Sequence, residues 1–400
     1  MGSYFDLMGN PLIQITKIMK RLTILVASLI LVLSLSAQEN YKTLSKEDSL
    51  KVYLGGETYQ VKKFSEKNKK KKPRNVILMI GDGMGTSQVY AGLTANKGNL
   101  YLNNFTKVGF SKTYSSDNYI TDSAAGGTAL STGVKTYNGA IGVNADTASV
   151  KTILEMAEEK GLATGLASTS SITHATPASF IAHQPKRSMY EEIAADFLKT
   201  DIDVFIGGGY KHFTERKDGR NLVNELKQNG YKVLQDINTI SEVQSGKLAG
   251  LTAPEHNGRV NERGNLLPIA TKTAINILKK DKDGFFLMVE GSQIDWAGHQ
   301  NNTIYAVEEM LDFDRSVGQA LEFAAKNRKT LIVVTADHET GGMGINGGNF
   351  ENGMLKAGYT TGGHTGVMVP VFAFGPGAEN FTGIMDNTDV AKKIMKLLDL

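Results

Sequence analysis

An aspartate followed by a serine, at positions 122 and 123, is the most informative chemical feature of this 400-residue chain. The stretch Thr121–Ala129 reads TDSAAGGTA, so small residues and a pair of glycines follow the serine. We expect a helix to begin here, because a helix N-terminus offers free backbone N–H groups and suits an anion such as phosphate. Ser123 is therefore a predicted nucleophile. Taken alone, the segment is better explained as a helix cap followed by a closely packed helix, and its surroundings reverse that preference.

Carboxylates and imidazoles gather at the ends of several predicted strands. These residues are Asp82, Glu290, Asp295, His299, Asp337, His338 and His364. In an open α/β sheet the carboxyl ends of the strands meet at one edge, where such folds place their active sites. Because crowded carboxylates repel one another, we expect bound cations to offset their charge.

The residue types narrow the choice of cation. Aspartate together with histidine suits zinc, whereas oxygen ligands from Asp, Glu and Thr suit magnesium. Asp295 and His299 are four residues apart, so both face one metal if they lie on a helical turn. Asp337 and His338 are adjacent and face the same side only if the backbone turns there.

Each of these pieces has a plainer explanation. Gly81–Gly85 could be a simple turn between a strand and a helix, and 337–340 could be a surface loop. Chance does not readily place all of them at strand ends. The remaining histidines lack such a setting and are predicted to be structural or surface residues, namely His183, His212 and His256.

The elements that must position these residues are short apolar runs alternating with helical patterns. The predicted strands are 76–80, 162–167, 204–206, 285–289, 331–334 and 369–374. The predicted helices are 149–160, 304–325 and 389–398, and the glycine-rich stretch 341–363 is predicted to be a loop region with at most a small excursion. This alternation predicts an α/β fold with a central, mostly parallel sheet flanked by helices on both faces.

The sequence divides into four predicted parts. Residues 1–18 are an upstream segment, and 19–38 combine a basic start, a short apolar run and small residues, which is typical of a secretory signal peptide. A retained signal anchor is the competing interpretation, although the apolar run is short for a membrane span. Residues 39–73 form a polar, basic linker, in which Lys69–Lys72 is predicted to be solvated rather than a binding patch. Residues 74–400 form the catalytic domain.

Composition excludes several classes of protein. A net charge of +3 is too small to indicate nucleic-acid binding. The chain has no cysteine, so it has neither a disulfide framework nor a lipoprotein attachment site. We expect an exported protein, periplasmic or secreted, without a stable membrane span once the signal peptide is removed.

Six motifs in this order resemble those of the alkaline phosphatase family, from about Asn75 to near the C-terminus. The motifs are Gly81–Gly85 (GDGMG), Thr121–Ala125 (TDSAA), His174–Ala178 (HATPA), Val289–Asp295 (VEGSQID), Ala336–Thr340 (ADHET) and Gly363–Thr365 (GHT). The resemblance implies hydrolysis of phosphate monoesters at alkaline pH. It also implies a phosphoserine intermediate on Ser123 and, commonly, a homodimer.

The resemblance further implies two Zn²⁺ and one Mg²⁺ per chain. The first zinc would be held by Asp295, His299 and His364. The second would be held by Asp82, Asp337 and His338. Magnesium would be held by Asp82, Thr176 and Glu290.

The phosphate would be bound by an arginine. Arg187 lies at the spacing after His174–Pro177 that the family pattern requires, and its neighbour Lys186 is the alternative on charge alone. A planar guanidinium fork suits two phosphate oxygens better than a point charge does. Asp122 is then expected to hold Arg187 in place rather than bind metal.

The chain departs from many bacterial family members at two positions. They carry aspartate where this chain has His174, and lysine where it has Trp296, so zinc or cobalt could compete with magnesium in the third site. Only a short segment separates His338 from His364, so the large surface domain that some members carry there is expected to be absent.

The alternative functions are those of a phosphodiesterase of the same superfamily and of a secreted phosphate- or metal-binding protein without turnover. A sulfatase is disfavoured because its nucleophile motif is missing.

Overall fold

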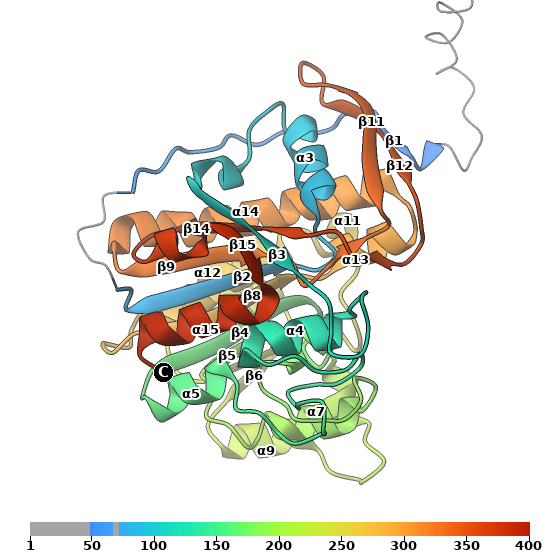
Figure 1. The fold of residues 1–400 in the computed structure, drawn as a ribbon. Coiled ribbons are helices and arrows are strands. Elements are labelled where there is room, and N and C mark those ends of the chain that lie inside the picture. Colours follow the sequence, from blue (N-terminus) through green and yellow to red (C-terminus); the bar gives the residue numbers. More distant parts are fainter. Residues whose placement is uncertain (1–48, 67–71) are drawn as a thin grey trace, which may run out of the picture. The chain divides into compact units, whose positions relative to one another are not determined.

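A ten-stranded sheet forms the centre of the fold in the computed structural model, which describes residues 49–66 and 72–400 (Figure 1). Along the sheet the strands are β15 (Gly383–Asp386), β3 (Lys107–Lys112), β14 (Val369–Phe374), β9 (Thr330–Thr335), β2 (Asn75–Gly81), β8 (Phe285–Gly291), β4 (Ala163–Ser171), β5 (Val204–Gly208), β7 (Leu248–Leu251) and β6 (Lys232–Leu234). β14 runs antiparallel to both of its neighbours, and every other neighbouring pair is parallel. The prediction of a mostly parallel sheet is therefore confirmed.

Helices cover both faces of this sheet because its central strands are apolar on both sides. Along β2, Ile77 and Met79 enter one hydrophobic core, while Val76, Leu78 and Ile80 enter the other. The first core is covered by α3 (Thr86–Ala95), α10 (Ile237–Ser241), α12 (Leu266–Leu278) and α14 (Thr303–Asn327). The second is covered by α4 (Ser123–Thr132), α5 (Ile153–Glu159), α6 (Ala175–Ala178), α7 (Tyr190–Asp196), α8 (Tyr210–Thr214), α9 (Leu222–Gln228) and α15 (Asn387–Leu398).

The start of α5 shows how local chemistry sets a boundary. The sequence pattern predicts a helix from residue 149, but the helix begins at Ile153. The Thr152 hydroxyl accepts a hydrogen bond from the backbone N–H of Glu155 at 3.2 Å, and the Glu155 carboxylate accepts one from the N–H of Thr152 at 2.8 Å. This capping box makes Thr152 the N-cap, so the helix begins at the next residue.

The segment 341–363, predicted as a loop, contains a hairpin of β11 (Met343–Asn349) and β12 (Met354–Tyr359). β12 also pairs with β1 (Val52–Tyr53), which makes a three-stranded sheet. Apolar side chains alternate along β12, and Leu355 and Ala357 point into the first core. The many glycines make this alternation difficult to recognise in the sequence. No large domain lies between His338 and His364, as expected.

Part of the segment predicted as a linker, 39–73, makes contacts with the rest of the fold. Within it, β1 pairs with β12, and the Tyr59 hydroxyl donates to Asp314 on α14 at 2.5 Å. Tyr59 also stacks on Tyr101 with ring centroids 5.9 Å apart. The predicted parts 1–18 and 19–38 lie outside the described residues. In the part of the chain that is described, no helix is both long and apolar enough to cross a membrane.

A buried ion cluster joins α11 (Val260–Arg263) to α14. The Arg263 guanidinium donates to Glu309 at 2.6 and 2.9 Å and to Asp312 at 2.7 Å. The three side chains are at most 2% exposed. Because one cation neutralises part of the charge of two carboxylates, the cluster is sensitive to the loss of Arg263.

We therefore expect Arg263→Met to lower the free energy of unfolding by about 3–5 kcal/mol, since it leaves the buried Glu309 without its cation and Asp312 with only the partly exposed Arg315. Thermal and urea denaturation measure the loss. Arg315→Met is the matched control, because the Arg315 side chain is 32% exposed and pairs with Asp312 at 3.3 Å. Equal stability of the two variants would contradict the assignment.

Candidate active site

The carboxyl edge of the sheet collects the predicted site residues from strands that are far apart in sequence. Asp82 follows β2, Glu290 is the penultimate residue of β8, and Asp337 and His338 follow β9. His364 precedes its main-sheet strand, β14, rather than following it. It reaches the same edge because β14 is antiparallel, so that the start of β14 lies where the parallel strands end.

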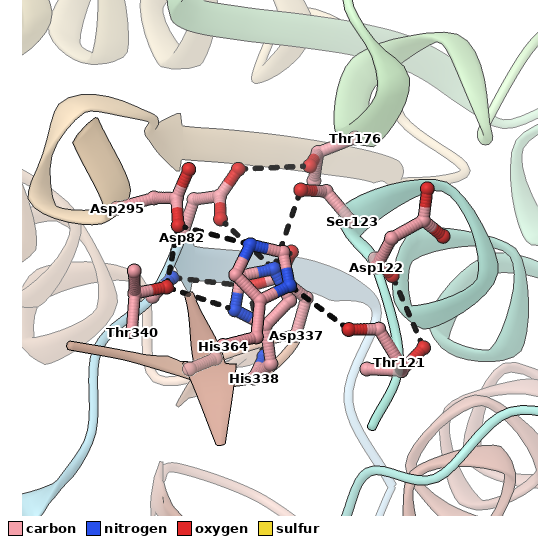
Figure 2. A network of polar contacts seen from close by, with 12 residues as sticks. Asp82, Thr121, Asp122, Ser123, Thr176, Asp295, Asp337, His338, Thr340 and His364 are labelled. Carbon is pink, nitrogen blue, oxygen red and sulfur yellow. Dashed lines mark hydrogen bonds and ion pairs between the residues drawn. The ribbon is translucent and has the colours of Figure 1, made fainter. Parts of the chain in front are cut away.

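Three groups of side chains in this edge could each hold a metal ion, with ligand atoms within 4.8 Å of one another. The groups are Asp295, His338 and His364; Asp82, Asp337 and His338; and Asp82, His174 and Glu290. Figure 2 shows the first two groups converging on the imidazoles of His338 and His364. The rings of these two histidines stack with centroids 3.5 Å apart. The backbone leaves the strand after Thr335, which allows Asp337 and His338 to face the same space.

His299 joins the first group from α13 (Gln293–His299). Its Nε2 lies 3.3 Å from an Asp295 oxygen and 3.2 Å from Nε2 of His364. Asp295 and His299 are on one helical turn, as their spacing predicts. His364 completes the group, with its Nε2 3.4 Å from Asp295.

Several buried polar atoms at this edge have no hydrogen-bond partner. They are Asp82 Oδ1, Glu290 Oε1, Asp337 Oδ2 and His174 Nδ1. Unpartnered buried acceptors are unfavourable. Three carboxylate oxygens and an imidazole nitrogen are also the donor atoms that Zn²⁺ and Mg²⁺ prefer. The donor set therefore fits divalent cations.

The electrostatics point the same way. Burial and the nearby Asp337 raise the pKa of Asp82 well above its ordinary value. Burial, and to a smaller extent the negative charge of Asp295, raises the pKa of Asp337 to about 6. Burial likewise raises the pKa of Glu290 to about 6. Burial would also raise the pKa of Asp295, but hydrogen bonds to His299 and His364 outweigh it and hold that pKa well below the usual range. Cations would favour the charged form of all four carboxylates.

Ser123 opens α4, and its Oγ lies 3.3 Å from Nε2 of His338. The side chain is buried, and it lies beside the group of Asp82, Asp337 and His338 (Figure 2). Thr176, from the short α6, also reaches this group, and its hydroxyl donates to the Asp82 carboxylate at 3.5 Å. The predicted nucleophile and the predicted metal ligands are therefore neighbours.

Asp122 has two functions in the geometry. One oxygen accepts hydrogen bonds from the N–H groups of Ala125 and Gly139 at 3.0 and 3.1 Å, which caps α4. The other oxygen accepts from Arg187 at 2.9 Å. The predicted contact between Asp122 and Arg187 is thus present, whereas Lys186 is exposed.

Sequence reasoning missed some of the surrounding residues. His256, for which it predicts a structural or surface role, packs beside the site, with its ring centroid 5.3 Å from that of His174 and 4.8 Å from that of Trp296. Thr340 donates to Asp295, and Ser168 donates to Glu290 at 2.5 Å. Hydroxyl groups carry no spacing signal, so only the ADHET motif could have indicated Thr340.

His183 and His212 do have structural settings. His183 pairs with Glu155 at 2.9 Å, and Nδ1 of His212 lies 2.7 Å from the Thr173 hydroxyl. Neither residue belongs to the metal-binding groups found among the described residues.

The sequence matches a known protein family over most of its length. The family model described as "Alkaline phosphatase" matches residues 73–355 and 349–400. The chain is 39% identical to alkaline phosphatase 3 of Bacillus subtilis (strain 168) over 413 aligned positions, which cover 81% of this chain and 89% of that protein.

Solved structures agree with the sequence comparison. The structure of the alkaline phosphatase from the Antarctic bacterium TAB5 is 44% identical, covers 82% of this chain and 99% of that chain, and has a TM-score of 0.77. A His-to-Asp variant of the TAB5 enzyme is described with magnesium bound in its M3 site, and it is 43% identical over 83% of this chain and 99% of that chain, with a TM-score of 0.77.

Removal of divalent ions with a chelator is expected to lower the midpoint of thermal unfolding and to abolish turnover. The physical reason is that the buried carboxylates lose the cations that offset their repulsion. Saturating ions stabilise by about 3 kcal/mol or more at roughly a hundredfold excess over the dissociation constant. Scanning calorimetry, with metal content measured by mass spectrometry, follows the loss and its recovery on adding zinc plus magnesium.

Asp82→Asn supplies the control, because the amide keeps the shape of the side chain and removes one negative charge. Its unfolding midpoint should fall less on chelation than that of the unsubstituted protein. An identical fall in both proteins would show that the lost stability does not come from ions at this edge.

Proposed function

The chain belongs to the alkaline phosphatase family, and we propose that it hydrolyses phosphate monoesters through attack of Ser123 on phosphorus. The observation that carries this assignment is the position of the Ser123 hydroxyl, which is buried at the start of α4 and 3.3 Å from His338. A hydroxyl at that point is next to two groups of metal-binding side chains. A helix N-terminus favours the negative charge of the phosphate.

We propose that the chain holds two Zn²⁺ and one Mg²⁺. Asp295, His299 and His364 would hold the first zinc, and Asp82, Asp337 and His338 the second. Magnesium would be held by Asp82, Thr176 and Glu290. The unpartnered oxygens of Asp82, Asp337 and Glu290 support this assignment. When bound, such ions lower the pKa of a hydroxyl or a water and offset the charge of phosphoryl oxygens.

The third site has an unusual neighbourhood. His174 lies with Asp82 and Glu290, and its ring packs edge-on against Trp296 with centroids 6.1 Å apart. Burial, followed by the positive charge of Arg187, lowers the pKa of His174 to about 3, so its ring is neutral. A neutral imidazole is a zinc ligand rather than a magnesium ligand. We infer that zinc or cobalt competes with magnesium in this site.

The reaction requires the chain to bind, orient and transfer a phosphoryl group. Arg187 would bind two equatorial phosphate oxygens through its planar fork, and the Ser123 N–H would donate to one of them. Asp122 is a positioning residue, since it fixes Arg187 with one oxygen and the first turn of α4 with the other. As the Ser123 Oγ gives up its proton and forms a bond to phosphorus, the ester bond between phosphorus and the substrate oxygen breaks, and that oxygen takes up a proton and leaves as the alcohol. A water oxygen then bonds to phosphorus, the bond between phosphorus and Oγ breaks, and Oγ regains a proton as inorganic phosphate is released.

We also propose that the protein is exported to the periplasm or secreted, and that it forms a homodimer. The composition of residues 19–38 supports export. At the edge of the main sheet, Val108 and Phe110 on β3 and Ile384 on β15 are exposed apolar side chains. Such a surface favours contact with a second copy.

Ser123→Ala is expected to reduce kcat on a phosphate monoester by at least about 10³-fold, because the nucleophile is removed while the binding groups remain. The unsubstituted enzyme should carry a phosphoryl group on the peptide containing Ser123 after an acid quench, as seen by mass spectrometry. Ser188→Ala, at an exposed serine, is the control. An active Ser123→Ala enzyme would refute the assignment, and faster turnover of a diester than of its monoester would favour the phosphodiesterase alternative.

Arg187→Ala is expected to lower kcat/KM by about 10²–10³-fold, since it removes the fork that neutralises two phosphoryl oxygens. Lys186→Ala should leave kcat/KM unchanged, because Lys186 is exposed beside Arg187 without reaching the site. Steady-state kinetics on one monoester compare the two. The reverse ranking would assign the phosphate contact to Lys186.

A further inference from the structure

The edge of the sheet opposite the active site carries an unusual concentration of positive charge. At this edge the chain enters the central strands β4, β8, β2 and β9 through the turns 160–162, 279–284, 72–74 and 328–329. We call these four turns the basic edge. Their charged side chains are the cations Lys72, Arg74, Lys160, Lys279, Lys280, Lys282, Arg328 and Lys329 and the carboxylates Asp281 and Asp283.

This charge is far from the average of the chain. Eight cations and two carboxylates give the basic edge a net charge of +6, whereas the whole chain has +3. The rest of the chain is therefore negative overall, and the molecule is electrostatically asymmetric.

The turns are in direct contact with one another. The backbone N–H of Arg74 donates to the carbonyl of Lys329 at 2.8 Å, and its guanidinium donates to the carbonyl of Lys282 at 3.0 Å. Lys72, Arg74, Lys160 and Lys329 also line one cavity of about 310 Å³, together with Asp283 and Asp399. The four turns therefore adjoin one another along this edge of the sheet.

Part of this charge is neutralised within the chain, and part is not. Lys72 pairs with Asp399, and Lys160 donates to the carbonyl of Leu398 at 2.5 Å. Among the described residues, no ion pair involves the exposed side chains of Lys280, Lys282 and Arg328. These cations are available to an external partner.

Stabilisation of helix ends accounts for only part of the pattern. Lys160, Lys279 and Arg328 cap the C-termini of α5, α12 and α14, where a cation is favourable for the helix dipole, and Lys329 follows directly. Arg74 and Lys282 lie at the starts of β2 and β8 instead, and Lys282 is three residues beyond the C-cap of α12. The neighbouring turn into β5 carries Asp201 and Asp203, so the positive surface also has a sharp lateral limit.

We propose that the basic edge docks the protein on an anionic lipid surface. Clusters of four to eight lysines and arginines bind anionic lipid headgroups, with about 1 kcal/mol for each cation near the surface. The basic edge contains no aromatic residue on which an unpaired nucleic-acid base could stack. An exported protein, as proposed above, also meets lipid headgroups rather than nucleic acid.

Docking in this orientation leaves the active site free. β2 spans seven residues between Asn75, at the basic edge, and Gly81, at the site. Six residue steps of strand separate these two residues by about 20 Å, so that the site faces solution while the basic edge contacts lipid. Turnover of a soluble substrate should therefore continue on the surface.

Sedimentation with vesicles tests the proposal on the full chain. The vesicles contain phosphatidylcholine alone, or with about one third phosphatidylglycerol, at about 50 mM and at about 500 mM NaCl. We expect binding only to the anionic vesicles at low salt. Lys280→Gln/Lys282→Gln/Arg328→Gln should weaken that binding by about 100-fold and leave turnover unchanged, because three surface cations are lost.

A variant with the same change in net charge controls for charge alone. Lys97→Gln/Lys186→Gln/Lys217→Gln removes three exposed cations outside the basic edge and should bind as the unsubstituted protein does. Insertion of the apolar run 22–35 would occur in neutral vesicles too, so the readout is the difference between the two lipids. Equal binding to both lipids, or an equal loss in both variants, would overturn the proposal. Displacement by duplex DNA at matched charge would overturn the choice of lipid as the partner.

Discussion

Four carboxylates buried at one edge of the sheet impose the constraint on which the rest of the structure depends. Asp82, Glu290 and Asp337 are fully buried, and Asp295 is nearly so. Their mutual repulsion and lost hydration would be strongly unfavourable without cations. The acidic edge is therefore tolerable only as a metal-binding edge. A metal-binding edge in turn needs histidines as further ligands and a rigid backbone that holds the ligands in place. The buried strands provide that rigid backbone.

The topology of the sheet brings the metal-binding side chains to one edge mainly through the directions of its strands. Parallel strands deliver Asp82, Glu290 and Asp337 to one edge because each residue lies at or just beyond the carboxyl end of its strand. The antiparallel β14 brings His364 to the same place from the opposite chain direction. Asp122 then links two functions, since the side chain that caps α4 also holds Arg187. The position of Ser123 and the orientation of the arginine thus depend on one residue.

Much of the fold was predictable, and the failures have physical causes. Apolar runs such as 76–80 and 285–289 indicate buried strands because they are apolar on both faces. The hairpin within 341–363 was missed, since its glycines obscure the alternation of Leu355 and Ala357. The contacts of β1 and Tyr59, within the predicted linker, were not predictable because their partners in β12 and α14 are far away in sequence. The position of His256 beside the site was not predictable for the same reason, as its neighbours His174 and Trp296 are distant in sequence.

The sequence by itself determined the chemistry. The types of the site residues, their attachment to strand ends and the spacing of Asp295 and His299 all follow from local order, because strand and helix periodicities are local properties. The tertiary structure alone decided which residues meet. It placed His338 between the two metal-binding groups, brought Arg187 rather than Lys186 to Asp122, and collected the basic turns at the opposite edge. These contacts join residues tens to hundreds of positions apart, and only the packing of the strands and helices brings them within a few ångströms.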